Sequence, residues 1–370
     1  MNEDKAARFH RLQRRCFWTA LGIQTIGLVV LVAGGWSQRL RDAALVLTGA
    51  TSPSSITTVI VFTAMLLALL EILGAPERFY RTFILERRYG LSDMPFSLWL
   101  SDYAKGRALG AVLGLAASIA VYLAIAIAPQ RWWMAVAALG VLTLIGAARL
   151  LPSVFLPMFY AFKPLDRDSL RERIESLSRR ANVPVLGIYE WGLGDKTRRA
   201  NAALVGTGRG RRILLSDTLL SQYSDDEIEV ILAHEMGHHA HRDIRNGLML
   251  EAACIVLVCA SAAVVLRGAW QPLGLESPAD VAGLPLLLMT AGAVSLVTTP
   301  LMHAWSRRNE HRADRFALTM TERPDAFVSA MRRLAAQNLA EERPSTATLW
   351  LFHSHPPFEQ RIQAARAFIS

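Results

Sequence analysis

The chain has 370 residues, of which 52% are hydrophobic and only 19% are charged, and its mean hydropathy is +0.27. A soluble domain normally carries about 25% charged residues, so this composition indicates a membrane protein. The net charge is +9, but the basic residues lie in loops beside apolar runs rather than on one face, which argues against nucleic acid as a partner. Three cysteines, two of them inside one apolar run, form neither a disulfide framework nor a cysteine-based zinc site.

Six stretches are apolar enough to cross a bilayer as helices, each with about the 20 residues that a span requires. A basic segment precedes the first stretch, as in a signal peptide, but five more follow, so we expect the first to stay in place as a membrane helix. The fold class is therefore a mainly α, polytopic membrane protein. The predicted spans are 17–34, 56–74, 107–128, 132–151, 247–266 and 281–303.

The basic residues alternate between successive loops and thereby orient the predicted spans. Five precede the first span and six follow the second, whereas the loops after the first, third and fifth spans carry two, one and one. Cytoplasmic loops are enriched in lysine and arginine, so both termini and segment 152–246 are expected on the cytoplasmic side. Only four basic residues are lysine, a bias typical of GC-rich bacteria, which favours a bacterial inner membrane over the endoplasmic reticulum.

Two polar parts of the chain are separated by a pair of spans but belong to the same predicted face of the membrane. We therefore divide the chain into N-terminal membrane helices over 1–160, a first protease part over 161–246, a helix pair over 247–303 and a second protease part over 304–370. Because the two protease parts share a face, they are expected to build one site together.

The first protease part is expected to combine a small β-element with a long helix. Polar and apolar residues alternate around glycine turns in "GIYEWGLGDKTRRANAALVGTGRGRRILLSDTLL", which predicts a small β-sheet or hairpin. In "SDDEIEVILAHEMGHHAHRD", Ser224 is followed three residues later by Glu227, a capping box that starts a helix. This helix places His234 and His238 one turn apart on one face, and the fifth span is expected to continue it after a short break.

The pattern His-Glu-x-x-His is filled by His234, Glu235 and His238. Two imidazoles four residues apart on a helix bind one zinc ion, and the glutamate between them acts on a metal-bound water. Zinc lowers the pKa of that water to about 7, which gives a nucleophile for a peptide carbonyl. The sequence thus predicts a zinc metalloendopeptidase with one Zn²⁺ per chain and Glu235 as a catalytic residue.

A third metal ligand is needed, and its position distinguishes between zinc protease types. The metzincin pattern requires Gly and His where this chain has His241 and Ile244, and a thermolysin-like glutamate would fall at Val258, inside the fifth span. In "SRRNEHRADRFAL", Glu310 and Asp314 lie four residues apart and share a helical face. Glu310 is therefore the predicted third ligand, and Asp314 is expected to accept a hydrogen bond from a ligand imidazole and fix its orientation.

With these motifs the chain resembles the type-I CAAX prenyl protease family, integral membrane zinc metalloproteases with HExxH and a downstream ExxxD. The resemblance covers most of residues 80–370, and the paired zinc motifs are its most specific part. It rests on "ILAHEMGHHAHRD", "SRRNEHRADRFA", "RANAALVG", "LFHSHPPFEQRI", "LPSVFLPMFYAFKPL" and "RRYGLSDMPFSLWLSDYAKG".

The resemblance implies a gluzincin-like protease domain with further functional residues. Asn201 in "NAALVG" would lie on the edge strand that lines the substrate cleft, and His355 in "SHPP" would stabilise the oxyanion of the tetrahedral intermediate. His353, two residues earlier, is an alternative for the oxyanion role. Members of the family typically have seven membrane helices around a water-filled chamber, whereas this chain shows six predicted spans.

Two functions remain open on the sequence. The first is a zinc endopeptidase at the cytoplasmic membrane face which, by the resemblance, removes the C-terminal tripeptide from prenylated proteins. The alternative is an HtpX-type quality-control protease of membrane proteins, which shares the zinc motifs. A metal transporter or an inactive scaffold fits less well, because the metal-binding residues lie outside the spans and Glu235 is intact. The expected partners are a peptide or protein substrate, prenylated under the first reading, and the lipid bilayer.

Overall fold

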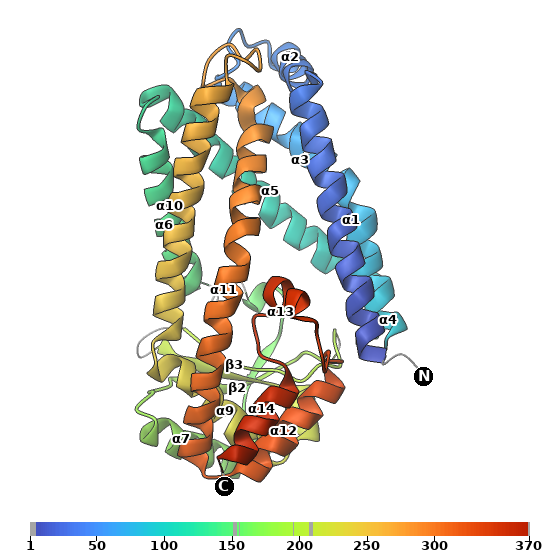
Figure 1. Cartoon of the computed structure of the whole chain (residues 1–370), viewed down its shortest axis with the longest axis vertical. Coiled ribbons are helices and arrows are strands. Elements are labelled where there is room, and N and C mark those ends of the chain that lie inside the picture. Colours follow the sequence, from blue (N-terminus) through green and yellow to red (C-terminus); the bar gives the residue numbers. More distant parts are fainter. Residues whose placement is uncertain (1–4, 151–153, 155, 195, 207–209, 369–370) are drawn as a thin grey trace.

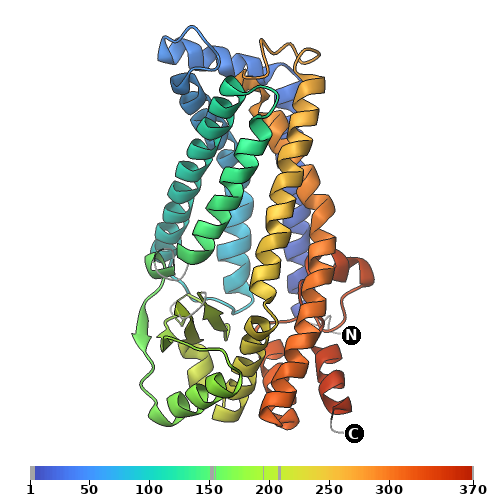
Figure 2. The ribbon, with the colours of Figure 1, turned by 90° about the vertical axis from the view of Figure 1, so that its left-hand side faces the viewer.

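The computed structural model describes residues 5–150, 154, 156–194, 196–206 and 210–368. Long helices form an upright bundle, and the strands and shorter helices lie together at its lower end, where both ends of the chain are also found (Figure 1). The view from the side shows the same division into a helical bundle and a globular end (Figure 2). Residue 151, the last of the predicted fourth span, lies outside the described residues.

Within the described residues, six helical segments are long and apolar enough to cross a membrane, in agreement with the six predicted spans. Most of them extend beyond the apolar stretch that defined the prediction, because polar turns at their lower ends continue the helix. They are α1 (Lys5–Ala33), α3 (Ile56–Phe79) with its continuation, α5 (Phe96–Ile127), α6 (Trp132–Leu150), α10 (Asp243–Ala269) and α11 (Leu284–Thr321).

Two spans differ most from their predicted bounds. The α3 helix continues through a π-helical turn, η1 (Tyr80–Leu85), into α4 (Glu86–Arg88). The α11 helix runs without interruption for 38 residues, so the acidic pair predicted to follow the sixth span lies on the same helix as that span.

The upper end of the bundle is closed by α2 (Trp36–Thr48) and by the loop that leads through η5 (Val281–Gly283) into α11. Their apolar side chains join one buried cluster with residues of α3, α5 and α10. Inside this closure a guanidinium nitrogen of Arg41 lies 2.5 Å from Asp280, and both side chains are buried. Ser37 also donates a hydrogen bond of 2.6 Å to the carbonyl of Ala282.

The globular end contains a four-stranded mixed sheet, which resolves the predicted choice between a small sheet and a hairpin. The strand order is β1-β2-β4-β3, with β2 parallel to β4 and the outer pairs antiparallel. The β3 strand therefore forms one edge of the sheet. The strands are β1 (Phe162–Pro164), β2 (Gly187–Trp191), β3 (Ala202–Val205) and β4 (Arg212–Ser216).

Helices from both polar parts of the chain pack into one core at this end. The core includes Leu170 and Ile174 on α7, Leu232 on α9 and Phe327 on α12, all nearly or fully buried. Segments on either side of the α10–α11 hairpin thus fold as a single unit (Figure 2). The helices at this end are α7 (Asp168–Arg180), α8 (Asp217–Gln222), α9 (Asp225–Ala240), α12 (Pro324–Gln337), α13 (Thr346–Phe352) and α14 (Phe358–Ala367), with a short 3-10 turn, η3 (Leu156–Met158).

Candidate metal centre

The α9 helix carries the His-Glu-x-x-His pattern and is fixed at its start by the predicted capping box. Ser224 Oγ accepts a hydrogen bond of 3.3 Å from the backbone N–H of Glu227, whose carboxylate accepts one of 2.9 Å from the backbone N–H of Ser224. A capping box satisfies two N–H groups that a helix start would otherwise leave unpaired. The apolar residues that follow are buried in the core, so His234 and His238 point toward α11.

A glycine allows α9 and α11 to approach closely at this point. A Cβ atom placed on Gly237 would lie 3.1 Å from the Cα of Ala313 and 3.3 Å from the side chain of Phe316. Contacts this short leave no room for a larger residue. The close approach brings Glu310, one turn before Ala313 on α11, opposite the two histidines.

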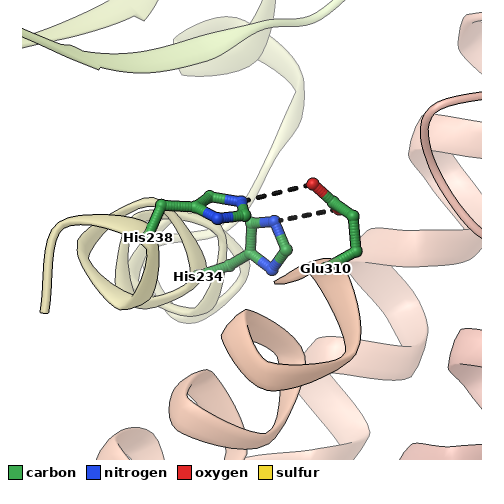
Figure 3. A group of neighbouring side chains, drawn as sticks. All are labelled: His234, His238 and Glu310. Carbon is green, nitrogen blue, oxygen red and sulfur yellow. Dashed lines mark ion pairs between the residues drawn. The ribbon is translucent and has the colours of Figure 1, made fainter. Parts of the chain in front are cut away.

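The two histidines and the glutamate predicted to hold a metal lie together in the structure. One ligand atom from each of His234, His238 and Glu310 falls within 4.8 Å of the others. The distance from Nε2 to the nearer carboxylate oxygen of Glu310 is 3.3 Å for each histidine (Figure 3). His234 and Glu310 are buried, while His238 is partly buried.

A carboxylate holds each imidazole through its other nitrogen. Nδ1 of His234 lies 2.9 Å from Asp314, and Nδ1 of His238 lies 3.0 Å from Asp243. A neutral imidazole that donates its proton at Nδ1 carries a lone pair at Nε2. In this tautomer both Nε2 atoms present lone pairs to the same point, which the carboxylate of Glu310 also faces.

The donor set fits a zinc ion. Ligand atoms about 2.0–2.1 Å from a tetrahedral zinc lie about 3.3–3.5 Å from one another, and the two imidazole–carboxylate distances are 3.3 Å. Glu310 Oε2 is buried and accepts no hydrogen bond of normal geometry from the described residues. A buried carboxylate that faces two imidazole nitrogens is stabilised by positive charge placed between them, which a bound cation supplies.

The electrostatics of His234 lead to the same conclusion. Burial alone would lower its pKa, but hydrogen bonding to Asp314 and Glu310 outweighs this effect and raises the pKa to about 9. A raised pKa in a buried imidazole means that the surrounding carboxylates stabilise positive charge at this position. The same surroundings stabilise a bound metal cation.

Three residues that complete the site, Asp243, Arg312 and Arg361, were not predicted from the sequence. Arg361 on α14 donates hydrogen bonds of 2.5 and 2.9 Å to Asp314, and Arg312 donates one of 2.6 Å to Asp243. Asp243 and Arg361 both stand in the quoted segments "ILAHEMGHHAHRD" and "LFHSHPPFEQRI". Asp243 could have been noticed in the sequence, because it is an acidic residue at the short break that follows the metal-binding helix.

Glu235 lies beside the metal ligands and faces a cleft. The cleft is a cavity of about 380 Å³ whose lining includes Glu235, Asn201, His353 and His355. Burial raises the pKa of Glu235 above its usual value, against the lowering effect of the neighbouring histidines. The carboxylate is thus next to the metal centre and open to a substrate in the cleft.

The two residues implied only by family resemblance also reach the cleft. Asn201 lies one residue before β3, and its backbone N–H donates a 2.9 Å hydrogen bond to Ser216 Oγ. His355 is 64% exposed, and its Nδ1 lies 2.9 Å from Glu310 Oε2. His353 instead faces Glu341 at 3.5 Å, so of the two histidines only His355 borders the metal centre.

Comparisons with known proteins agree with this arrangement. The chain is 31% identical over 240 residues to the uncharacterized metalloprotease YhfN of Bacillus subtilis, an alignment that covers 64% of this chain and 56% of that protein. It is 27% identical over 322 residues to the probable CAAX prenyl protease 1 of Schizosaccharomyces pombe, covering 84% of this chain and 66% of that one. The chain thus spans less than two thirds of the length of these two relatives.

The fold itself matches a solved structure over almost its whole length. The crystal structure of S. mikatae Ste24p superposes with a TM-score of 0.82 at 22% identity, covering 98% of this chain and 87% of the other. Residues 4–161 match the family described as CAAX prenyl protease N-terminal, five membrane helices. Residues 164–369, which carry the whole metal centre, match peptidase family M48, and this multi-pass integral membrane protein belongs to that family.

Proposed function

We propose that this protein is a zinc metalloendopeptidase that cleaves peptide bonds beside the membrane. The observation that carries the proposal is the convergence of two imidazole Nε2 atoms and the Glu310 carboxylate, with Glu235 adjacent in the cleft. In this proposal His234, His238 and Glu310 hold one Zn²⁺ per chain. Asp314 orients His234 through its Nδ1.

Glu235 is the proposed general base and acid. When bound, the zinc ion supplies Lewis acidity to the attacking water and the scissile carbonyl. Glu235 takes a proton from that water and delivers it to the leaving amine. A carboxylate whose pKa is raised by burial is suited to both steps, because its pKa lies nearer the working pH.

Residues in the walls of the cleft are proposed to bind the substrate and to stabilise the oxyanion. Within the described residues β3 is an edge strand with no further strand beside it, although the carbonyl of Leu204 lies 3.0 Å from Nε2 of His239. An extended substrate is therefore proposed to add to the beginning of β3 as a further strand, near Asn201. His355 is proposed to donate a hydrogen bond to the oxyanion that forms at the scissile carbonyl. Its position against Glu310 and its exposure to the cleft support this role.

For the substrate we propose a prenylated C-terminal CAAX tail. The proposal is supported by the relatives named CAAX prenyl protease 1, of which the S. pombe protein is one, and by the match of the N-terminal helices to a family described in the same terms. The distribution of basic residues supports an active site on the cytoplasmic face. The excess of arginine over lysine favours a bacterial inner membrane.

The test is cleavage of a farnesylated CAAX peptide beside its unprenylated twin by the protein purified in detergent. Glu235→Gln and a zinc chelator serve as blanks. We expect a strong preference for the farnesylated peptide and no cleavage in either blank. Equal cleavage of both peptides would contradict the prenylated substrate and favour quality control of the HtpX type, and cleavage by the Gln variant would contradict the mechanism.

A further inference from the structure

The segment 353–357, which connects α13 to α14, carries His355. The α13 helix packs beside α11, just above the globular end of the molecule (Figure 1). In the middle of this connecting segment, Nδ1 of His355 lies 2.9 Å from Oε2 of Glu310. The position of the imidazole beside the metal centre therefore depends on how the two ends of the connecting segment are held.

The end nearer α14 is fixed by two prolines and by a buried ion pair. Pro356 and Pro357 follow His355 directly, and a proline ring locks its own φ angle and restricts the residue before it. In the first turn of α14, Arg361 donates hydrogen bonds of 2.5 and 2.9 Å to Asp314 of α11, and both side chains are buried. The backbone therefore has little freedom on this side of His355.

The end nearer α13 is held by Arg307, which lies on α11 one turn before Glu310. Its Nη1 donates a hydrogen bond of 3.0 Å to the carbonyl of Leu349 and one of 2.6 Å to the carbonyl of His353. The same guanidinium lies over the ring of Trp350, 5.5 Å from its centroid. Arg307 thus ties the last turn of α13 and the first residue of the connecting segment to α11.

The α11 residues that hold the two ends of the connecting segment share a helical face with Glu310. Arg307, Glu310 and Asp314 are three and four residues apart, a spacing that places their side chains along one side of the helix. The outer two hold the ends of the connecting segment, and the middle one faces the histidine between them. A single helix therefore sets the place of His355 relative to Glu310.

We propose that Arg307 is a positioning residue for His355. By holding the carbonyl of His353, it removes the freedom left in the two residues before His355 and keeps the imidazole where the oxyanion forms. Misplacing a reacting group by about 1 Å can cost about 10²-fold in rate, so this tether matters to the chemical step. The inference rests on the proposed function, in which His355 donates a hydrogen bond to the oxyanion. Arg307 acts through the backbone and takes no part in the reaction itself.

The experiment is a double-mutant cycle between Arg307 and His355. The full-length zinc-loaded wild type, Arg307→Met, His355→Ala and the double variant are assayed in detergent for kcat and KM. The substrate is whichever of the farnesylated peptide and its unprenylated twin the wild type cleaves faster. Methionine keeps an apolar stem beside Trp350 and removes the N–H donors.

Two further variants complete the design. Arg308→Ala is the matched control, because Arg308 is an exposed neighbour on the same helix. Arg307→Lys tests rescue, because one nitrogen of Arg307 serves both carbonyls and a lysine ammonium also carries several N–H donors on one nitrogen. Zinc content and thermal unfolding confirm that each variant is loaded and folded.

We expect His355→Ala to lower kcat by about 10²–10³-fold, the usual cost of removing an oxyanion donor. Arg307→Met should lower kcat by about 10–100-fold and change KM by less than about threefold, since it disturbs the chemical step and leaves substrate binding in place. Arg308→Ala should match the wild type, and Arg307→Lys should keep at least about threefold more kcat than Arg307→Met. In the His355→Ala background, Arg307→Met should lower kcat by less than about twofold, because the group that Arg307 positions is already absent.

The cycle separates failure of the inference from failure of the proposed function. Equal losses of kcat from Arg307→Met in both backgrounds would overturn the inference alone, because they would show a general structural effect. Wild-type kcat in the folded Arg307→Met variant, or the same kcat in Arg307→Lys and Arg307→Met, would also overturn it. Undiminished kcat in His355→Ala would overturn the proposed oxyanion role and the inference with it, and no cleavage of either peptide by the wild type would overturn the proposed function itself.

Discussion

The two ends of the helix bundle both bury carboxylates, but the groups that these carboxylates face differ. At the upper end the Asp280 carboxylate receives the Arg41 guanidinium and the backbone N–H groups of Glu276 and Ala282. At the lower end the Glu310 carboxylate faces the Nε2 atoms of His234 and His238 at 3.3 Å, and within the described residues its buried Oε2 accepts no hydrogen bond of normal geometry.

This difference distinguishes the carboxylate of Asp280, which has a structural role, from that of Glu310, which has a functional one. A buried carboxylate with all its acceptor sites filled needs no ligand, and its role is to hold elements together. A buried carboxylate that faces two imidazole lone pairs is incomplete as protein alone. By this criterion the upper end is a closure, and the lower end is a binding site for a cation.

The largest expected effect comes from the group that acts chemically at the lower end. Glu235→Gln should reduce kcat by about 10²–10⁴-fold or more, because general acid–base catalysis contributes about that much. The metal content should stay at one zinc per chain, since Glu235 is not a proposed ligand. Metal analysis and peptide cleavage on the same preparation test this, and loss of zinc in the variant would contradict the assignment.

A substitution in the buried ion pair at the upper end should lower the stability of the protein and leave its catalytic activity unchanged. Arg41→Ala leaves Asp280 as a buried charge without its guanidinium partner, which costs about 3–5 kcal/mol in comparable buried pairs. The free energy of unfolding in detergent should fall by that order, with zinc content unchanged. Arg39→Ala is the control, because Arg39 is exposed and stacks on Trp36 at the same end. Equal losses in the two variants would contradict the structural role of the Arg41–Asp280 pair.

Neutralising a carboxylate at each end sharpens the comparison further. Asp243→Asn should weaken zinc binding by about 10–100-fold, because it removes the carboxylate that orients His238. Asp280→Asn should leave zinc affinity unchanged although it also removes a buried charge. Competition with a chelator of known affinity measures both. Weaker zinc binding in the Asp280 variant would mean that the two ends are not independent.

The smallest expected effect concerns the start of the metal-binding helix. Ser224→Ala removes the side chain that accepts the N–H of Glu227, and losing such a cap costs about 1 kcal/mol. Thermal unfolding should show a correspondingly small decrease in stability with zinc still bound. A decrease as large as that of Arg41→Ala would show that the cap does more than satisfy a helix end.

The sequence was sufficient for features that depend on local pattern. The six spans follow from long apolar runs, the α9 cap from Ser224 and Glu227, and the spacing of His234 and His238 from helical periodicity. Glu310 was predicted because a zinc site needs a third ligand and because the acidic pair of Glu310 and Asp314 lies on the same predicted face of the membrane as the two histidines. Each of these inferences needed only neighbours in sequence or an incomplete coordination shell.

Features that depend on long-range packing could not be predicted in this way. Arg361 is one of many arginines in the chain, and only the folded structure selects it as the partner of Asp314, 47 residues away. The contact between Arg14 and Glu341 joins residues 327 positions apart. The very short β1 strand was also missed, because it pairs with β2 across the whole of α7.

The unbroken course of α11 links the membrane to the chemistry. Its 38 residues correspond to about 57 Å at 1.5 Å per residue, nearly twice the about 30 Å of a bilayer's hydrocarbon core. The first part of this rod spans the lipid, and the last part carries Glu310 against α9. One continuous helix thereby sets the distance of the metal site from the membrane, and the tight packing of α9 on α11 at Gly237 keeps the two histidines with Glu310.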